Sequence, residues 1–283
     1  MECKKQKGRA WSVRLQEEIR TDKSGTFVTL TFSNQSIKEL AQEIKNLEGY
    51  NLENEIATLA TRRFLERWRK KHKTSVKHWL ITELGQPNAK YQGTENLHLH
   101  GIIFSQARED IKQIWKYGHV FLGTHVNEAT VNYCIKYCTK VDVAHKEYNA
   151  KILTSPGIGS NYINRLDAAS NKFKKKGETD ETYTTRQGKK MNLPIYYRNK
   201  IYSEEEREQL WLQKLDKNER WINGKKVSTK DGGKQYHKML KLAQEKNKRL
   251  GYGDDSINWE RKKYENDRRN ANLKKRLGEI EEN

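Results

Sequence analysis

The segment Leu97–Phe104, with the sequence LHLHGIIF, constrains the fold of this chain most, because it places two histidines inside an apolar run. Such a run predicts a strand, on which alternate side chains point to the same face. His98 and His100 then lie side by side, on the same face as Ile102 and Phe104. Two imidazoles on one rigid strand make half of a metal site, but a surface strand carrying two polar residues explains the pattern equally well.

Two further segments predict strands that could pair with this one. Thr26–Phe32 is β-branched and aromatic throughout, and Val76–Glu83 ends in an apolar run with a carboxylate at its last position. A carboxylate on the apolar face of a strand is costly unless it is paired or ligated. Because a polar loop joins Val76–Glu83 to the two-histidine strand, we expect a hairpin that brings Glu83 near His98 and His100. The three side chains would form a metal site with positions open for substrate.

A helix is predicted to follow Asn127, which is a good N-cap, and to run through Lys140. At about 100° per residue, its apolar residues form one stripe: Val131, Cys134, Ile135 and Cys138. Tyr133 and Tyr137 lie one turn apart and away from this stripe, accompanied by Lys136 and Lys140. Phenols beside ammonium groups suit a nucleophile that must meet a phosphate.

The remaining patterns give the outline of the chain. They predict helices at 55–73 and 109–115, a short strand at 118–123, a turn at 155–159 and an extended segment at 191–198. From Ser203 the chain becomes polar, lysine-rich and punctuated by glycine, and Glu204–Glu206 open a helix. We therefore expect a catalytic domain at 1–202 and a helical, lysine-rich C-terminal extension at 203–283.

The charge balance favours a polyanionic partner. The 283 residues include 56 Lys and Arg against 37 Asp and Glu, a net charge of +19, and phosphates attract such surfaces at long range. No apolar run approaches the ~20 residues of a membrane-spanning helix, and no signal-peptide pattern opens the chain. Cys134 and Cys138 lie one helical turn apart, a poor disulfide geometry, which favours a reducing cytosol. No Gly-x-x-x-x-Gly-Lys-Ser/Thr loop is present, so a helicase is not expected.

Taken together, three segments resemble the motifs of the HUH endonuclease superfamily, in rolling-circle order: Phe27–Phe32, His98-Leu99-His100 and Tyr133-x-x-Lys136-Tyr137-x-x-Lys140. Three further segments, at 4–14, 155–159 and 193–198, are similar to the replication initiators of Microviridae, the gokushovirus-like single-stranded DNA phages. The resemblance covers roughly residues 4–200 in order, which one short motif could not do.

The resemblance implies an α+β fold of the ferredoxin or RRM-like type. A central antiparallel sheet would carry helices on one face, with the two-histidine strand near its centre. It also implies a divalent metal ion, Mg or Mn, ligated by His98 and His100 with Glu83 as the third ligand.

The resemblance further implies that Tyr133 and Tyr137 are nucleophiles, while Lys136 and Lys140 are candidates to stabilise phenolate or phosphate charge. One tyrosine would cut a single-stranded or melted origin, become linked to the 5′ phosphate and free a 3′ hydroxyl; the other would end the round and release a circular genome. The implied partners are the single-stranded DNA origin and the host helicase and DNA polymerase, in the cytoplasm of a bacterial host.

Two alternatives remain open from the sequence. A relaxase or single-strand transposase would share the metal strand and the tyrosine helix, although tyrosines placed after the histidines argue against a relaxase. A non-catalytic single-stranded nucleic-acid-binding protein would instead have structural histidines and would stack bases on Trp11, Trp115 or Tyr117.

Overall fold

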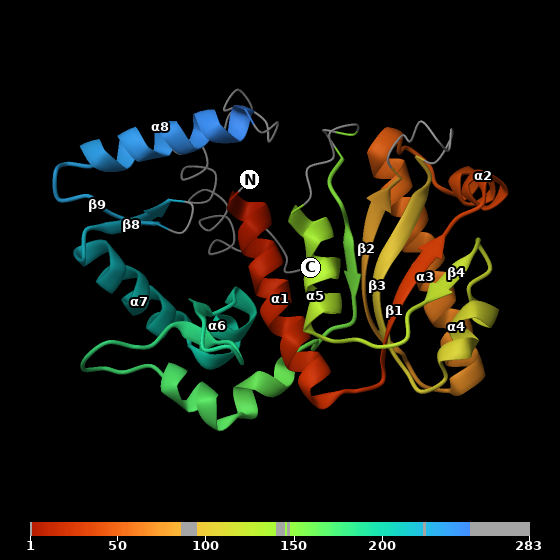
Figure 1. The fold of residues 1–283 in the computed structure, drawn as a ribbon, viewed down its shortest axis with the longest axis horizontal. Coiled ribbons are helices and arrows are strands. Elements are labelled where there is room, and N and C mark those ends of the chain that lie inside the picture. Colours follow the sequence, from red (N-terminus) through yellow and green to blue (C-terminus); the bar gives the residue numbers. More distant parts are fainter. Residues whose placement is uncertain (1, 86–94, 140–144, 146–147, 223–224, 250–283) are drawn as a thin grey trace, which may run out of the picture. The chain divides into compact units, whose positions relative to one another are not determined.

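The structure is a computed structural model, and it describes residues 2–85, 95–139, 145, 148–222 and 225–249 (Figure 1). The chain forms two compact units, Met1–Lys217 and Asn218–Asn283. The boundary expected at residue 202 therefore falls within the first unit, which also contains helix α7 (Glu204–Asp216). Residues 86–94 of the predicted loop and 250–283 of the predicted extension lie outside the described residues.

The first unit contains a five-stranded antiparallel sheet in the order β4-β1-β3-β2-β5. Its strands are β1 (Gly25–Thr31), β2 (Lys77–Leu84), β3 (Leu97–Phe104), β4 (Val120–Leu122) and β5 (Ile152–Thr154). The predicted α+β class is confirmed, and the two-histidine strand β3 is central. The predicted hairpin of β2 and β3 is confirmed as well, with Glu83 paired directly to His98.

Gly101 permits the close approach of β3 to β2. A Cβ atom at this position would collide with the carbonyl oxygen of Trp79 and would lie 2.8 Å from the Cα atom of Leu80. Both contacts are with backbone, which cannot move aside as the end of a flexible side chain can. The residue after the second histidine is therefore restricted to glycine by the neighbouring strand.

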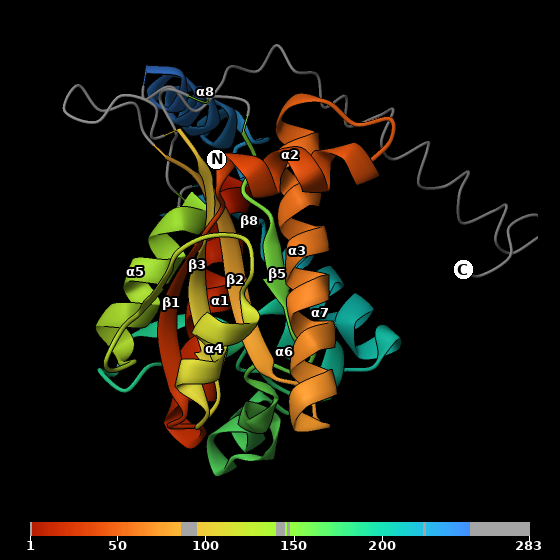
Figure 2. The same ribbon diagram turned by 90° about the vertical axis from the view of Figure 1, so that its right-hand side faces the viewer.

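One face of the sheet is covered by three helices (Figure 2). They are α2 (Asn34–Glu43), α3 (Gly49–His72) and α4 (Arg108–Ile114). Phe64 and Trp68 of α3 pack in one apolar cluster with Leu80, Leu99 and Ile103 of the central strands. The apolar residues that recur at helical spacing along 55–73 lie on the side of α3 that this contact buries.

The other face is covered by α1 (Glu2–Thr21) and α5 (Glu128–Thr139) (Figure 1). The expectation of helices on one face is therefore wrong. β2 and β3 bury apolar side chains on both faces, with Trp79 and Ile102 opposite to Leu80 and Ile103. A sheet that is apolar on both faces must bury both, so a second layer of helices is required.

The rest of the first unit packs around a third apolar cluster, which includes Val13 of α1. Its elements are the 3₁₀ helices η1 (Ser160–Asn164) and η2 (Leu166–Asn171), strands β6 (Thr182–Thr184) and β7 (Lys190–Asn192), and helices α6 (Ile195–Ile201) and α7. The expected extended segment at 191–198 is wrong from Ile195 on, because Pro194 is the N-cap of α6. A proline has a backbone angle suited to a helix start and lacks only an N–H that would be unpaired there.

The described part of the second unit contains a hairpin of β8 (Glu219–Ile222) and β9 (Lys225–Ser228), followed by α8 (Lys234–Arg249). Across both units, none of the described helices combines the length and apolar composition that crossing a bilayer requires.

Candidate metal centre and tyrosine pair

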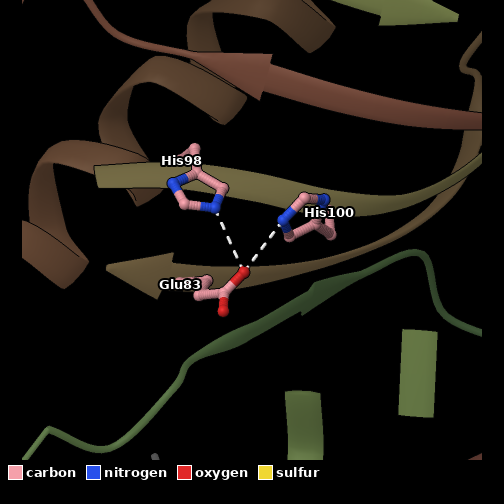
Figure 3. A group of neighbouring side chains, drawn as sticks. All are labelled: Glu83, His98 and His100. Atoms are coloured by element: carbon pink, nitrogen blue, oxygen red, sulfur yellow. Dashed lines mark hydrogen bonds and ion pairs between the residues drawn. The ribbon is translucent and has the colours of Figure 1, made fainter. Parts of the chain in front are cut away.

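Glu83, His98 and His100 meet on the face of the sheet that α1 and α5 cover (Figure 3). The Oε2 atom of Glu83 lies 2.9 Å from Nε2 of His100 and 3.1 Å from Nε2 of His98. The register explains this convergence, because Glu83 is directly opposite His98 and His100 lies two residues further along the same strand. One ligand atom from each side chain lies within 4.8 Å of the others.

Each imidazole is oriented by its second ring nitrogen. Nδ1 of His98 lies 2.9 Å from the carbonyl oxygen of Asn96, and Nδ1 of His100 lies 3.0 Å from the hydroxyl of Thr29. Since a carbonyl only accepts, Nδ1 of His98 must carry the proton. A neutral His98 then directs the lone pair of Nε2 at a carboxylate oxygen of Glu83. Either a proton or a cation must lie between these two atoms to remove their repulsion.

The donor set fits a divalent cation. Two imidazole nitrogens and one carboxylate oxygen suit first-row transition metals, and carboxylates extend the choice to Mg²⁺ and Mn²⁺. The Nδ1 contacts supply the outer hydrogen bonds that hold metal-binding histidines in place. The side chains of Glu83, His98 and His100 are 12%, 19% and 10% exposed, so the cluster is not sealed from solvent. The cluster could therefore bind a metal ion with positions left for a substrate.

Helix α5 places both predicted tyrosines beside these ligands. The ring of Tyr137 stacks on the imidazole of His100, with 4.4 Å between centroids and 12° between planes. The ring of Tyr133 lies 6.3 Å from that of His100, and the hydroxyl of Tyr137 donates to the hydroxyl of Tyr133 over 2.6 Å. The helix starts as predicted, because Asn127 caps it by accepting a hydrogen bond from the N–H of Thr130.

The two tyrosines differ in exposure. Tyr133 is 45% exposed, whereas Tyr137 is buried with Val131 and Cys134. Burial, and next the hydrogen bond to Tyr133, raise the pKa of the Tyr137 phenol. The sequence placed Tyr137 away from the apolar stripe of the helix. That part of the prediction is wrong, since Tyr137 lies on the side of α5 that faces the sheet.

The apolar side of α5 is broader than one stripe because the helix packs on two elements. Cys138 and Thr139 lie next to Gly8 of α1, where a Cβ atom would be 2.9 Å from Cγ2 of Thr139. The absence of a side chain at Gly8 allows α1 to approach α5 closely.

Of the two predicted lysines, only Lys136 lies among the residues that the structure describes. Lys136 is exposed on α5, and Lys140 lies outside the described residues. Two other lysines, Lys4 and Lys7 of α1, instead line a cavity of about 210 Å³ together with Glu83 and Tyr137. The basic composition of the first residues indicated that they could bind phosphate, but nothing in the sequence pattern indicated which part of the structure they contact.

The aromatic residues considered for base stacking lie in the core or at its edge. Trp115 is buried, and its indole N–H donates to the carbonyl of Thr31 over 2.9 Å. Tyr117 stacks on Phe32, and Trp11 packs on a buried tryptophan of β2. Trp115 is therefore unavailable to a base, which corrects that part of the alternative.

Residues 25–142 match the model of a protein family described as Replication-associated protein, of the ORF2 type. The comparison with curated proteins gave no match, and neither did the comparison with solved structures. The matched range contains the three candidate ligands and both tyrosines, and it begins after α1. Because the family is one of rolling-circle replication initiators, the match supports a replication initiator.

Proposed function

We propose that this chain is a rolling-circle replication initiator of the HUH type, related to those of Microviridae, that nicks a single-stranded or melted DNA origin with a tyrosine. The observation that carries the proposal is the stacking of Tyr137 on His100, 4.4 Å apart, which places the phenol-bearing helix against the candidate metal ligands. The order of the motifs along the chain and the family match over residues 25–142 support it.

Glu83, His98 and His100 would hold Mg²⁺ or Mn²⁺. When bound, such an ion neutralises charge on the scissile phosphate and fixes its orientation. Lys4 and Lys7 add two positive charges beside Glu83 and Tyr137, where a DNA backbone would approach. They add to the role that the sequence suggested for Lys136 and Lys140.

Tyr133 is the first nucleophile in this proposal, because this residue is 45% exposed while Tyr137 is buried. The hydrogen bond that Tyr137 donates stabilises the negative charge that grows on the Tyr133 oxygen as its proton leaves to solvent. The oxygen attacks phosphorus, and the bond from phosphorus to the 3′ oxygen breaks. The leaving oxygen takes up a proton and becomes a 3′ hydroxyl, while the 5′ phosphate is linked to Tyr133.

The linkage to tyrosine conserves the phosphodiester bond, so a later joining step needs no ATP. A host DNA polymerase extends the 3′ hydroxyl, and a host helicase separates the strands in the bacterial cytoplasm. Tyr137 then cuts the regenerated origin, for which its ring must leave His100. The free 3′ hydroxyl attacks the first linkage, which closes the circle and restores Tyr133.

A covalent-capture experiment tests this proposal. The protein is incubated with Mn²⁺ and a 3′-labelled library of random single-stranded oligonucleotides, and labelled protein is resolved on a denaturing gel. We expect a covalent adduct that is lost at least 100-fold in Tyr133→Phe and in His98→Ala/His100→Ala. Tyr137→Phe should still form the first adduct, more slowly because the hydrogen bond to Tyr133 is lost, and should lose strand joining.

The matched control is Tyr236→Phe, a tyrosine of α8 in the second unit, which should leave the adduct unchanged. An adduct that persists in Tyr133→Phe/Tyr137→Phe would overturn the nucleophile assignment. If the protein binds single strands without metal and forms no covalent adduct, the result would instead favour the non-catalytic binding protein.

A further inference from the structure

The edge strand β4 places an exposed aromatic ring in line with the candidate site. Phe121 is 53% exposed, and it pairs across the sheet with Thr29. Thr29 pairs on its other side with His100. Because directly paired residues of neighbouring strands project to the same face, these three side chains form one row that leads from the edge of the sheet to the metal ligands.

A second aromatic residue joins Phe121 to the tyrosine pair. The ring of Phe27 lies 6.4 Å from that of Phe121 and 5.6 Å from that of Tyr133, both in edge-on geometry. The same ring is nearly parallel to the imidazole of His100, 6.1 Å away. Phe27 thus links the ring of Phe121 with the ring of the exposed Tyr133 and with the imidazole of a candidate metal ligand.

The exposure of Phe121 runs against the usual composition of sheet edges. Edge strands commonly carry charged residues that prevent pairing with other chains, and a large apolar side chain gains stability only when it is buried. The side chain before it, Val120, is buried in the opposite core. Val120 therefore anchors β4 in the core, whereas the ring of Phe121, which contacts Phe27, stays more than half exposed.

We propose that Phe121 is a stacking platform for one base of single-stranded DNA, next to the scissile phosphate. Aromatic rings on a sheet bind the faces of bases with little sequence preference, and the chain's net charge of +19 favours a polyanionic partner. The strand would cross the site from β4 to the cavity lined by Lys4 and Lys7. The position of the scissile phosphate in this arrangement rests on the proposed function.

The test measures binding without cleavage. Anisotropy titrations in EDTA use the full chain with fluorescent dT₁₂ and with a twelve-residue abasic strand that keeps the phosphates but has no bases. We expect Phe121→Ala to weaken dT₁₂ binding about 5- to 100-fold and to leave the abasic strand unaffected. Phe121→Trp should retain affinity, whereas Phe121→Leu should lose it, because leucine is apolar but cannot stack.

Trp211→Ala is the matched control, since Trp211 is 57% exposed on α7 and lies outside the proposed surface. Its affinity for both strands should equal that of the wild type. Lys4→Gln/Lys7→Gln should weaken both strands alike and should lower the slope of log affinity against log salt by about 1 to 2.

Each contrary result has a distinct meaning. The stacking proposal fails if Phe121→Ala binds dT₁₂ as the wild type does, or if it loses equal affinity for dT₁₂ and for the abasic strand. It also fails if Phe121→Leu keeps full affinity. If dT₁₂ binding depends on Phe121 but no covalent adduct forms with Mn²⁺, the platform stands and the nicking proposal fails. If the adduct forms in wild type and Phe121→Ala binds normally, the nicking proposal stands and the platform fails.

Discussion

The two faces of the central sheet are built by the same strands but hold different chemistry. On the face under α2, α3 and α4, Leu99 and Ile103 of β3 lie in an apolar core. On the face under α1 and α5, Ile102 is buried in a smaller apolar cluster, and the same strand continues into His98 and His100. A single strand thus contributes to a stable core on one side and to a reactive site on the other.

The difference between the two faces shows where in a sheet a cluster of imidazoles and a carboxylate can exist. Imidazoles and a carboxylate lose hydration when they are covered, and they are tolerated only where they pair with one another or with a cation. Glu83 pairs with both histidines at the end of the sheet, where the cover by helices is incomplete. The fully covered face provides the stability that this polar end does not. Four substitutions test this division, given below from the largest expected effect to the smallest.

Gly101→Val should disrupt the central sheet and therefore both of its faces. Its side chain would collide with the backbone of Trp79 and Leu80, so β2 and β3 would have to separate. We expect a loss of about 4 kcal/mol or more in the free energy of unfolding, and little folded protein. Thermal unfolding followed by circular dichroism checks this, with Thr184→Val as the control, because Thr184 is an exposed position of strand β6. A cooperative transition at the wild-type temperature would contradict the role of Gly101.

Ile103→Ala should damage only the covered face. The side chain is fully buried, so the free energy of unfolding should fall by about 2–5 kcal/mol as measured by urea titration. The affinity for Mn²⁺ of the protein that remains folded should not change, because Ile103 points away from the ligands. A parallel loss of Mn²⁺ affinity would show that the two faces are not independent.

Glu83→Gln should have the converse effect. The amide keeps the shape of the side chain and can still hydrogen-bond the imidazoles, but it removes the negative charge that attracts a cation. We expect Mn²⁺ binding measured by calorimetry to weaken about 100-fold, and the stability in EDTA to fall far less than in Ile103→Ala. The exposed pair member Glu66 of α3 offers a control as Glu66→Gln, which should bind Mn²⁺ normally. Normal Mn²⁺ binding by Glu83→Gln would remove this residue from the ligand set.

His78 should produce the smallest effect. It is a titratable group on the face under α2, α3 and α4. It is buried, and its Nδ1 lies 2.9 Å from the hydroxyl of Ser155. Burial lowers the pKa of His78 below its ordinary value of 6.5, despite the opposing effect of the Val76 carbonyl. Below pH 6.5 His78 is therefore protonated in the unfolded chain but still neutral in the folded chain. The free energy of unfolding should fall as the pH is lowered from 6.5 to the pKa of His78 in the folded chain.

Urea titrations from about pH 7.5 to about pH 5 check the His78 effect. His78→Gln should show a shallower decline in the free energy of unfolding than the wild type, and His125→Gln, at an exposed position, should follow the wild type. Equal slopes for His78→Gln and wild type would show that His78 titrates alike in both states.

The local elements were predictable because the chain itself carries their signals. The two-residue period over 97–104 predicted β3, and the polar loop between two apolar runs predicted the hairpin that pairs Glu83 with His98. Asn127 predicted the start of α5 through its capping side chain. Each of these signals depends on neighbours in the sequence, so no distant contact was needed to interpret them.

What the sequence by itself determined is therefore the strand with its histidines, the carboxylate opposite them and the helix that carries the tyrosines. Only the tertiary structure decided that Tyr137 is buried against His100, that Lys4 and Lys7 rather than Lys136 line the cavity, and that Phe121 stands exposed in the same row. The physical reason is that periodicity gives the direction of a side chain within its own element. Which other element comes to meet it depends on how helices and strands far apart in the chain pack together.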